Sequence, residues 1–314
     1  MNAPQAAVSA SPSEDRPGGE PLAHIAPALF APMGVDGVYA RTALYVRICE
    51  GLETYITGLR EPGVEVMRFP PVMSRKQLEK SGYLKSFPNL LGCVCALHGT
   101  EPVIRAAADR LEQGGDWTAA LSASDLVLSP AACYPVYPIA AARGALPAGG
   151  WQFDIEADVF RHEPSRSLDR LQSFRMREFV RIGSPQEIVA YRERWLSRAP
   201  QIAADLSLPH TLDIANDPFF GRVGRLLAAQ QREQELKWEL LAPVAGDAPT
   251  AIASSNYHQD HMGHTYGITT AAGEPAHTGC MAFGEERVTL ALFAAHGLDV
   301  DEWPAEVRAT LELD

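Results

Sequence analysis

The stretch VFRHEPSRSLDRLQSFRMREFV, residues 159–180, decides the fold because it joins two strand-like segments through a polar loop. The loop, residues 164–173, is rich in Pro, Ser, Arg and Asp. Apolar residues share one face of the preceding segment, 151–163: Trp151, Phe153, Ile155, Ala157 and Val159. This alternation is typical of a strand with one buried face, and the returning segment FRMREFVRI also favours a strand. The sequence therefore predicts a long antiparallel hairpin.

Side chains suited to a nucleotide occupy this hairpin. Arg161 and Glu163 are two residues apart, which places them on one face if both lie in the strand. Phe174, Met176 and Glu178 share a face of the returning strand. A guanidinium, a carboxylate and an aromatic ring are what an adenylate site needs. Taken alone, Arg161 and Glu163 also fit a solvated ion pair, and Phe174 fits core packing.

Outward from the hairpin, helices and strands alternate in groups. Apolar residues recur at helical spacing over about 42–60, and residues 103–112 and 285–296 also favour helices. A strand-rich stretch runs from about 250 to 283. Grouped antiparallel strands with flanking helices predict the α+β class.

An inserted helical segment is expected at about 185–240. Ser184 and Glu187 form a capping box with a proline at the first helical position. Asp217 and the proline that follows it are expected to begin a second helix, whose core face consists of Val223, Leu226 and Leu227.

Composition limits the class of protein. The chain has 314 residues and a formal net charge of -12, which makes tRNA an unlikely main partner because phosphate binding needs a basic face. It contains no apolar run long enough for a membrane span and no secretory signal. Five scattered cysteines indicate reduced thiols and a cytoplasmic protein. Residues 1–21 are expected to form a disordered tail, and 22–314 to form one catalytic domain.

Three segments carry a resemblance to a known family: 67–91, 159–180 and 279–297. In this order they resemble motifs 1, 2 and 3 of the class II aminoacyl-tRNA synthetases, and above all those of the zinc-dependent archaeal seryl-tRNA synthetases. The resemblance covers about residues 40–300. It implies a class II catalytic domain, a mixed and mostly antiparallel sheet flanked by helices. It also implies a homodimer, because Pro71 matches a motif 1 proline at the dimer interface. Pro71 alone also fits an ordinary edge-strand proline.

The resemblance implies roles for four residues in binding ATP. Arg161 would hold the α-phosphate and the substrate carboxylate, stabilising charge that develops at phosphorus. Glu163 would accept from the adenine amino group, and Phe174 would stack on the ring. Arg287 would cover the other face of adenine and reach the γ-phosphate. Mg²⁺ is expected to accompany ATP. The carboxylate that the family places just before the segment Ser254–Asn256 is missing here, so the sequence does not place the magnesium ligands.

The resemblance also implies a zinc site. Cys133, Glu178 and Cys280 fall where the archaeal enzymes bind zinc, and three protein ligands leave a position open for the α-amino group of the substrate. From the residues alone, two buried free thiols and a carboxylate paired with Arg177 would fit as well.

Two further cysteines and three histidines are open to other interpretations. The run that contains His258, His261 and His264 is expected to supply pocket contacts rather than a separate metal site. Cys93 and Cys95 are expected to fill the core.

The chain departs from a tRNA synthetase in lacking the tRNA-binding parts. About 65 residues precede the first motif and 17 follow Gly297, so neither a long helical arm nor an anticodon domain is expected. This pattern resembles the amino acid:[carrier protein] ligases, truncated homologues of seryl-tRNA synthetases. It implies that ATP activates a small amino acid, glycine or alanine. The aminoacyl group then passes to the phosphopantetheine thiol of a carrier protein.

The resemblance also suggests substrate contacts at Asp217, Lys237 and Asn256. A helix N-cap and a surface lysine are alternatives for the first two. A basic face formed by Arg222, Arg225 and Arg232 is a candidate carrier-docking surface, or else a solvated helix face. Two other functions stay open: a non-catalytic paralogue that binds adenylate or a partner, and aminoacylation of tRNA itself.

Overall fold

The fold centres on a seven-stranded sheet in the order β3-β7-β8-β12-β11-β10-β9. We describe it from a computed structural model that covers residues 22–245 and 249–314, so the expected tail at 1–21 lies outside the described residues. Neighbouring strands pair antiparallel except β3 and β7, which are parallel. The strands are β3 (Glu65–Arg68), β7 (Trp151–Phe160), β8 (Ser173–Gly183), β9 (Thr211–Ile214), β10 (Lys237–Pro243), β11 (Pro249–Gln259) and β12 (His277–Gly284).

The predicted hairpin is confirmed as β7 and β8, which pair over ten residues from Trp151↔Ile182 to Phe160↔Ser173. Phe153, Ile155 and Val159 are buried, as the alternation predicts. One detail of the prediction is wrong. The strand ends at Phe160, so Arg161 and Glu163 lie in the loop beyond it and do not share a strand face.

Helices cover one face of the sheet and complete the larger core. They are α2 (Ala43–Gly58), α7 (Pro185–Asp205), α10 (Glu285–His296) and α11 (Ala305–Thr310), together with α1 (Leu22–Leu29). Their apolar side chains pack with Phe179, Met281 and Phe283 from the sheet. The predicted capping box begins α7, because Ser184 and Glu187 bond to each other's backbone, and α10 ends at Gly297 as expected.

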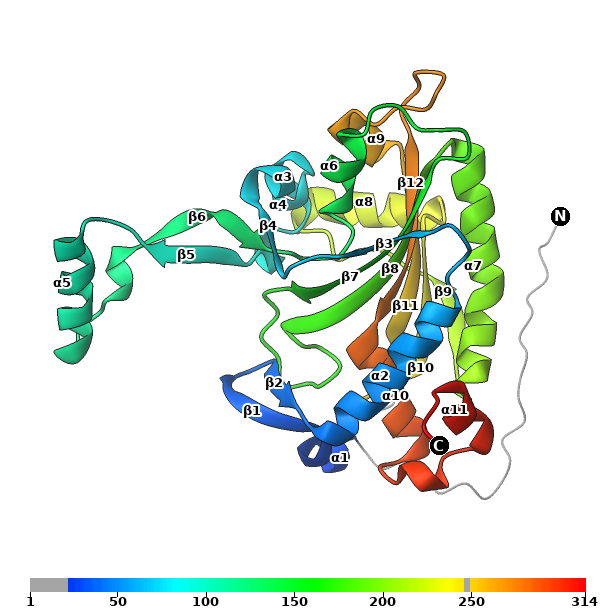
Figure 1. Ribbon diagram of the computed structural model, residues 1–314, viewed down its shortest axis with the longest axis horizontal. Coiled ribbons are helices and arrows are strands. Elements are labelled where there is room, and N and C mark those ends of the chain that lie inside the picture. The colour runs from blue at the N-terminus through cyan, green and yellow to red at the C-terminus, as the bar shows by residue number, and fades with distance from the viewer. Residues whose placement is uncertain (1–21, 246–248) are drawn as a thin grey trace.

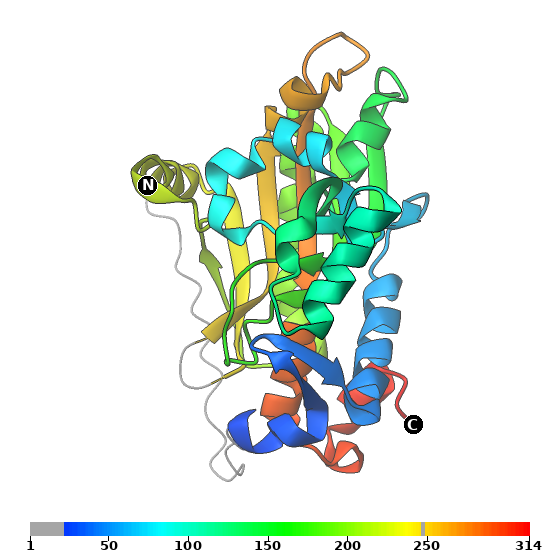
Figure 2. The ribbon, with the colours of Figure 1, turned by 90° about the vertical axis from the view of Figure 1, so that its left-hand side faces the viewer.

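The opposite face of the sheet carries a second core and a cavity. Here α6 (Val136–Ala141) and α9 (His261–Tyr266) pack on β7, β8 and β12. Beside them lie α3 (Arg75–Lys80), α4 (Tyr83–Ser86), the short helix η1 (Pro88–Leu90) and α8 (Gly221–Glu233). Figure 2 shows α8 at the outer edge of the molecule, on the opposite side from α2.

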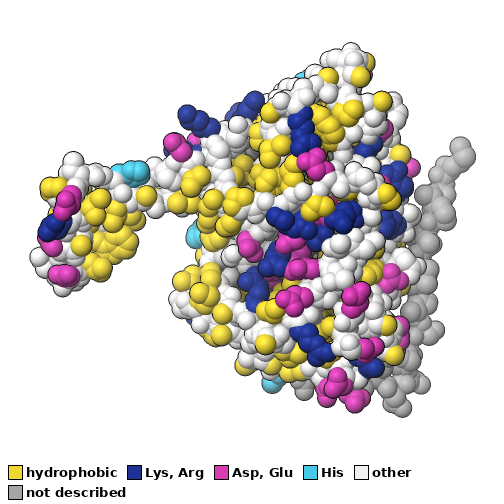
Figure 3. All heavy atoms as spheres, in the orientation of Figure 1, with side chains coloured by type: hydrophobic (Ala, Val, Ile, Leu, Met, Phe, Trp, Pro, Cys, Tyr) yellow, Lys and Arg dark blue, Asp and Glu magenta, His cyan; other side chains and the backbone are white. Residues whose placement is uncertain are grey.

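A three-stranded sheet extends from the body as an arm (Figure 1). It comprises β4 (Val72–Ser74), β5 (Cys93–Leu97) and β6 (Leu121–Leu128), and α5 (Glu101–Glu112) and η2 (Thr118–Ala120) lie at its far end. The helix expected at 103–112 is thus confirmed. Cys93 and Cys95 are exposed on the arm, so the expectation that they fill the core is wrong. Figure 3 shows hydrophobic side chains gathered on this arm.

The remaining elements lie at the two ends of the chain. β1 (Phe30–Val35) and β2 (Val38–Arg41) form a small hairpin, and η3 (Val300–Glu302) precedes α11. Among the described residues, no helix is long and apolar enough to cross a membrane.

Candidate active site

One cavity of about 550 Å³ collects the candidate residues on the sheet face opposite α2 and α10. The residues on its floor are paired with one another across neighbouring strands. Glu239 on β10 pairs with Ser254 on β11, Ser254 pairs with Ala282 on β12, and Ala282 pairs with Glu178 on β8. All four residues line the cavity. Because paired residues point to the same side of a sheet, this row spans the cavity floor from one side to the other.

One end of the cavity holds the three predicted zinc ligands. The backbone N–H of Cys133, in the loop before α6, donates to Oε1 of Glu178 at 3.0 Å. Burial raises the pKa of the Cys133 and Cys280 thiols well above the usual value, and the neighbouring Glu178 raises it further. Burial also raises the pKa of Glu178, although hydrogen bonds from both thiols and from the Cys133 backbone oppose this. The structure therefore brings together all three residues that the sequence predicted.

The chemistry of these donors suits zinc. Two sulfurs and a carboxylate oxygen are typical zinc ligands. Their ligand atoms do not all lie within 4.8 Å of one another, so the side chains must move to bind a single ion. The alternative prediction, that Glu178 pairs with Arg177, is wrong. Arg177 points to the other face of the sheet, where it donates to both carboxylate oxygens of Asp154 at 2.5 and 2.7 Å.

Polar neighbours fix the position of Cys280. The side-chain amide of Asn256 donates to Sγ of Cys280 at 3.4 Å and to Oγ of Ser254 at 3.1 Å. Nε2 of His258 lies 3.9 Å from the same sulfur, and its Nδ1 is 3.0 Å from Oγ1 of Thr278. Burial lowers the pKa of His258 to about 4, so this ring is neutral at physiological pH.

The three histidines of the 258–264 run do not form a separate metal site. Only His258 lies in a strand, because His261 and His264 belong to α9. His261 bonds to the carbonyl of Ser81, whereas His264 pairs with Asp260 on the surface. The expectation of pocket contacts is supported for His258 and His261, which both line the cavity.

The other end of the cavity holds the predicted nucleotide contacts. Cζ of Arg161 lies 5.5 Å from the centre of the Phe174 ring, and its Nε donates to the carbonyl of Pro130 at 3.0 Å. Glu163 pairs with Arg170 at 2.8 Å. Arg287 donates to the carbonyls of Asp169 and Ala251. Arg161, Glu163, Phe174 and Arg287 all line the cavity, although they come from a loop, a strand and a helix.

Asp217 and Lys237 form a buried ion pair in the cavity wall at 2.7 Å. Asp217 is not a helix N-cap, because α8 begins only at Gly221. Lys237 is not a surface lysine, because its side chain is just 12% exposed. Burial by itself raises the pKa of Asp217, but Lys237 and a hydrogen bond from Gln231 lower it overall. Gln231 lies on α8, so the helix is joined to the cavity wall through Asp217.

The surface of α8 differs from the expectation. Arg222, Arg225 and Arg232 are exposed as predicted. The expected core face is wrong, because Val223 and Leu226 are each 69% exposed and Leu227 is 40% exposed. Helical periodicity predicted an apolar stripe on α8 but not that the stripe faces away from the core.

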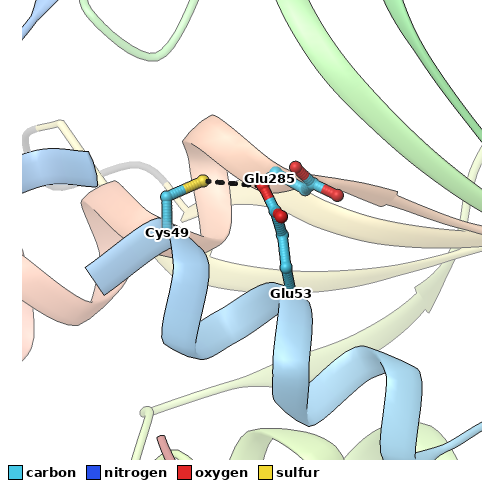
Figure 4. A group of neighbouring side chains, drawn as sticks. All are labelled: Cys49, Glu53 and Glu285. Carbon is cyan, nitrogen blue, oxygen red and sulfur yellow. Dashed lines mark hydrogen bonds between the residues drawn. The ribbon is translucent and has the colours of Figure 1, made fainter. Parts of the chain in front are cut away.

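A second cluster of possible ligands lies behind the sheet, between α2 and α10. Ligand atoms of Cys49, Glu53 and Glu285 all lie within 4.8 Å of one another (Figure 4). The guanidinium of Arg175 contacts Glu53 and lies 3.8 Å from Glu285, so positive charge is already present. Glu285 is 0% exposed, and neither of its oxygens has a hydrogen-bond partner among the described residues. Burial raises the pKa of Glu285 well above the usual range, and the nearby Glu156 and Glu53 add to this.

Sequence reasoning missed two cavity residues, Glu239 and Gln231. Lys237 and Glu239 stand two apart in the segment KWELL, an alternation that places both on one strand face. Gln231 had no comparable signal, since a single glutamine on a helix is usually solvated.

Comparisons with known proteins agree with this arrangement. No family model matches the chain. It is 62% identical over 295 residues to amino acid–[acyl-carrier-protein] ligase 1 of Bradyrhizobium diazoefficiens, covering 94% of this chain and 90% of that one. It is 60% identical over 309 residues to ligase 2 of the same organism, covering 98% and 92%.

Among solved structures, the chain is similar to M. kandleri SerRS, crystallised in complex with A. aeolicus tRNASec. The TM-score is 0.82 at 20% identity, and the likeness covers 96% of this chain and 62% of that one. At this identity the likeness shows the fold alone, which is the predicted class II synthetase fold.

Proposed function

Because the chain belongs to the amino acid–[acyl-carrier-protein] ligase family, we propose that it activates a small amino acid with ATP and loads it onto a carrier protein. The amino acid carboxylate attacks the α-phosphorus of ATP, and pyrophosphate leaves. The phosphopantetheine thiol of the carrier then attacks the acyl carbon. The bond to the phosphate oxygen breaks, the thiol proton is released, and a thioester and AMP result.

One observation carries this proposal. A single cavity joins the nucleotide end, with Arg161, Phe174 and Arg287, to the sulfur end, with Cys133, Glu178 and Cys280. Such a cavity places a bound amino acid beside the α-phosphate of ATP, as in-line attack requires. Arg161 holds the α-phosphate and the amino acid carboxylate, and the Phe174 ring and Arg287 enclose the adenine. Glu163 accepts from the adenine amino group.

We further propose that Cys133, Glu178 and Cys280 hold Zn²⁺. Zinc held by these three residues would bind the α-amino group of the substrate. Asn256, which donates to Cys280, supports the sulfur from the cavity side. Asp217 and Lys237 line the adjoining wall. The substrate is glycine or alanine in this proposal, and no residue of the chain serves as a covalent nucleophile.

The carrier docks on α8 in this proposal. This chain is acidic, and an acidic carrier protein needs a local basic patch to dock on it, which Arg222, Arg225 and Arg232 provide. The exposed side chains of Val223 and Leu226 lie among these arginines and add apolar contact area. Leu227, Gln230, Gln231 and Gln234 of the same helix line the cavity, so the docking surface lies next to the site of reaction.

The homodimer and the cytoplasmic location remain part of the proposal. Pro71 lies between β3 and β4, and its carbonyl accepts from the backbone N–H of Ser129 at 2.9 Å. Exposed apolar side chains on α5, among them Val103, Ile104 and Leu111, are a surface that a second copy would cover. Light scattering of the purified protein measures this directly, and a mass of one chain would contradict the dimer.

The amino-acid-dependent exchange of pyrophosphate into ATP tests the proposed function. Exchange that depends on glycine or alanine supports the activation step, and loading of a phosphopantetheinylated carrier completes the test. A protein that binds adenylate without exchange is the non-catalytic paralogue. Transfer to total tRNA rather than to the carrier would instead identify a tRNA ligase.

A further inference from the structure

The β7–β8 loop, residues 161–172, carries much of the proposed ATP site. Six of its residues line the cavity: Arg161, Glu163, Leu168, Asp169, Arg170 and Leu171. A loop that positions a reacting phosphate must be held in one geometry, because a misplacement of about 1 Å can cost about 100-fold in rate. The contacts that hold this loop lie outside the cavity, on the hairpin of β1 and β2.

Gln172 ends the β7–β8 loop opposite Arg161. It is 4% exposed and does not line the cavity. Its carbonyl accepts from the backbone N–H of Arg161 at 2.9 Å, which continues the β7–β8 ladder beyond its last pair, Phe160↔Ser173. The position of Gln172 therefore fixes the backbone of the arginine that we expect to hold the α-phosphate.

The tip of the β1–β2 hairpin holds Gln172 in turn, and Figure 1 shows this hairpin next to the β7–β8 loop. The backbone N–H of Gln172 donates to the carbonyl of Gly37, and its side-chain amide donates to the carbonyl of Asp36, both at 2.8 Å. Gly37 has a φ of +79°, and a Cβ at this position would lie 3.1 Å from Cγ of Gln172. The backbone conformation and the close approach therefore both favour glycine at the tip.

The β1–β2 hairpin is anchored to the body at its base. Phe30 is buried in the larger core, and its ring centre lies 5.1 Å from that of Tyr45 on α2. Arg41, at the end of β2, pairs with Glu286 at the start of α10. Glu286 also accepts from the backbone N–H of Arg175 on β8 at 2.8 Å. The hairpin thus joins the core at one end to the β7–β8 loop at the other.

A third contact between hairpin and loop contributes little. Nε of Arg166 lies 3.3 Å from Oδ2 of Asp36, but the arginine side chain is 88% exposed. An exposed ion pair is screened by water and adds little to stability. The two hydrogen bonds that the buried Gln172 donates therefore carry the connection.

We propose that the β1–β2 hairpin braces the β7–β8 loop, and that Gln172 is the positioning residue through which the hairpin acts on ATP binding. The inference rests on the proposed function, because it assigns this loop to ATP. Gln172 touches no substrate. It acts by holding the backbone of Arg161 in the geometry that the α-phosphate requires.

Calorimetric titration with ATP tests the brace from the side of the loop. Gln172→Met keeps the length of the side chain but has no N–H to donate to Asp36. Its dissociation constant for ATP is expected to rise by about tenfold, which corresponds to about 1.4 kcal/mol. The KM for ATP in pyrophosphate exchange rises in parallel. Zinc content and the thermal transition stay near the wild-type values, which separates a positioning role from a loss of folding.

Two glycines of the hairpin provide a matched pair of variants. Gly34 has a φ of +81°, but a Cβ there would meet nothing within 4 Å, whereas a Cβ on Gly37 would press on Gln172. Both alanine variants bear similar backbone strain, so only Gly37→Ala is expected to weaken ATP binding. Gly37→Ala combined with Gln172→Met binds ATP no more weakly than the weaker single variant, because both changes break the same connection.

Hydrogen exchange of the backbone amides of Arg161 and Gln172 gives a readout that needs no ATP. Exchange is expected to be faster in Gly37→Ala than in Gly34→Ala, because only the first change loosens the loop. Equal exchange in the two variants, or wild-type affinity for ATP in Gln172→Met, overturns this inference alone. A wild type that binds no ATP overturns the proposed function, and the exchange rates still decide whether the hairpin holds the loop.

Discussion

Arg161 and Phe174 meet across the loop of the central hairpin, with the guanidinium carbon 5.5 Å from the ring centre. The contact holds the arginine beside the ring, because a guanidinium is attracted to the face of an aromatic side chain. The same two residues line the cavity, so the hairpin presents a ring and a positive charge together.

Arg161→Ala is expected to abolish adenylate formation while the fold is kept. Loss of a charge-assisted contact to the reacting phosphate raises the barrier by at least about 2.7–4 kcal/mol, by analogy with the removal of an oxyanion-hole donor. Pyrophosphate exchange measures this. Arg166→Ala is the control, because that side chain lies in the same loop, is 88% exposed and pairs with Asp36 on the surface. Near-normal exchange in Arg161→Ala would refute the role.

Cys133→Ala is expected to remove most of the zinc. Elemental analysis of the wild type is expected to give about one zinc per chain, since one set of three ligands holds one ion. Cys93→Ala removes an exposed thiol on the arm and leaves the metal content unchanged. Full zinc content in Cys133→Ala would mean that the ion binds elsewhere.

Reversal of Arg222 and Arg225 to Glu is expected to weaken carrier loading and spare activation. The KM for the carrier rises by at least about tenfold, because like charges across an interface cost several kcal/mol. Pyrophosphate exchange and transfer to free pantetheine stay near the wild-type rates. Val223→Ser tests the apolar part of the same surface and weakens loading without a change in salt dependence. Unimpaired loading by the double variant places the docking surface elsewhere.

Glu285→Gln is expected to stabilise the protein at high pH and to change little at low pH. Burial raises the pKa of Glu285 in the folded state, so the proton is held more tightly there than in the unfolded chain. The associated stability is fully present below the ordinary carboxyl pKa and is lost as the pH rises through the folded value. Glutamine has no proton to lose, so the thermal transitions of variant and wild type diverge as the pH rises.

Glu286→Gln is the control for Glu285. Burial raises the pKa of Glu286 as well, but its contacts with Arg41 and the Arg175 backbone N–H oppose this rise, so its variant diverges less from the wild type as the pH rises. If the thermal transition temperatures of the wild type and Glu285→Gln change with pH in the same way, the pKa of Glu285 is not raised in the folded protein.

The hairpin, the helix after Ser184 and the gathering of Cys133, Glu178 and Cys280 could be predicted from the sequence. Alternation and capping are local signals, and β7 and β8 pair in the predicted way. The trio followed from the family resemblance, because residues so far apart carry no spacing signal of their own.

The errors concern properties that the local pattern does not determine. An apolar stripe on a helix does not determine whether the core or another protein covers it. The sequence therefore predicts a core position for Val223 and Leu226, although both are exposed. Lys237 was open to interpretation as a surface residue, because its partner Asp217 is twenty residues away and their pairing depends on the sheet. Glu239 was missed for the same reason, since Ser254 reaches it only through strand pairing.

The two-sided character of α8 has a consequence for engineering. Its inward side is fixed, because Gln231 bonds to Asp217 and a Cβ on Gly224 would lie 2.6 Å from the backbone of Phe219. Its exposed side chains Arg222, Val223, Arg225 and Leu226 do not line the catalytic cavity. Grafting the outward residues of a related ligase onto this helix should therefore exchange the choice of acceptor while the amino acid that is activated stays the same.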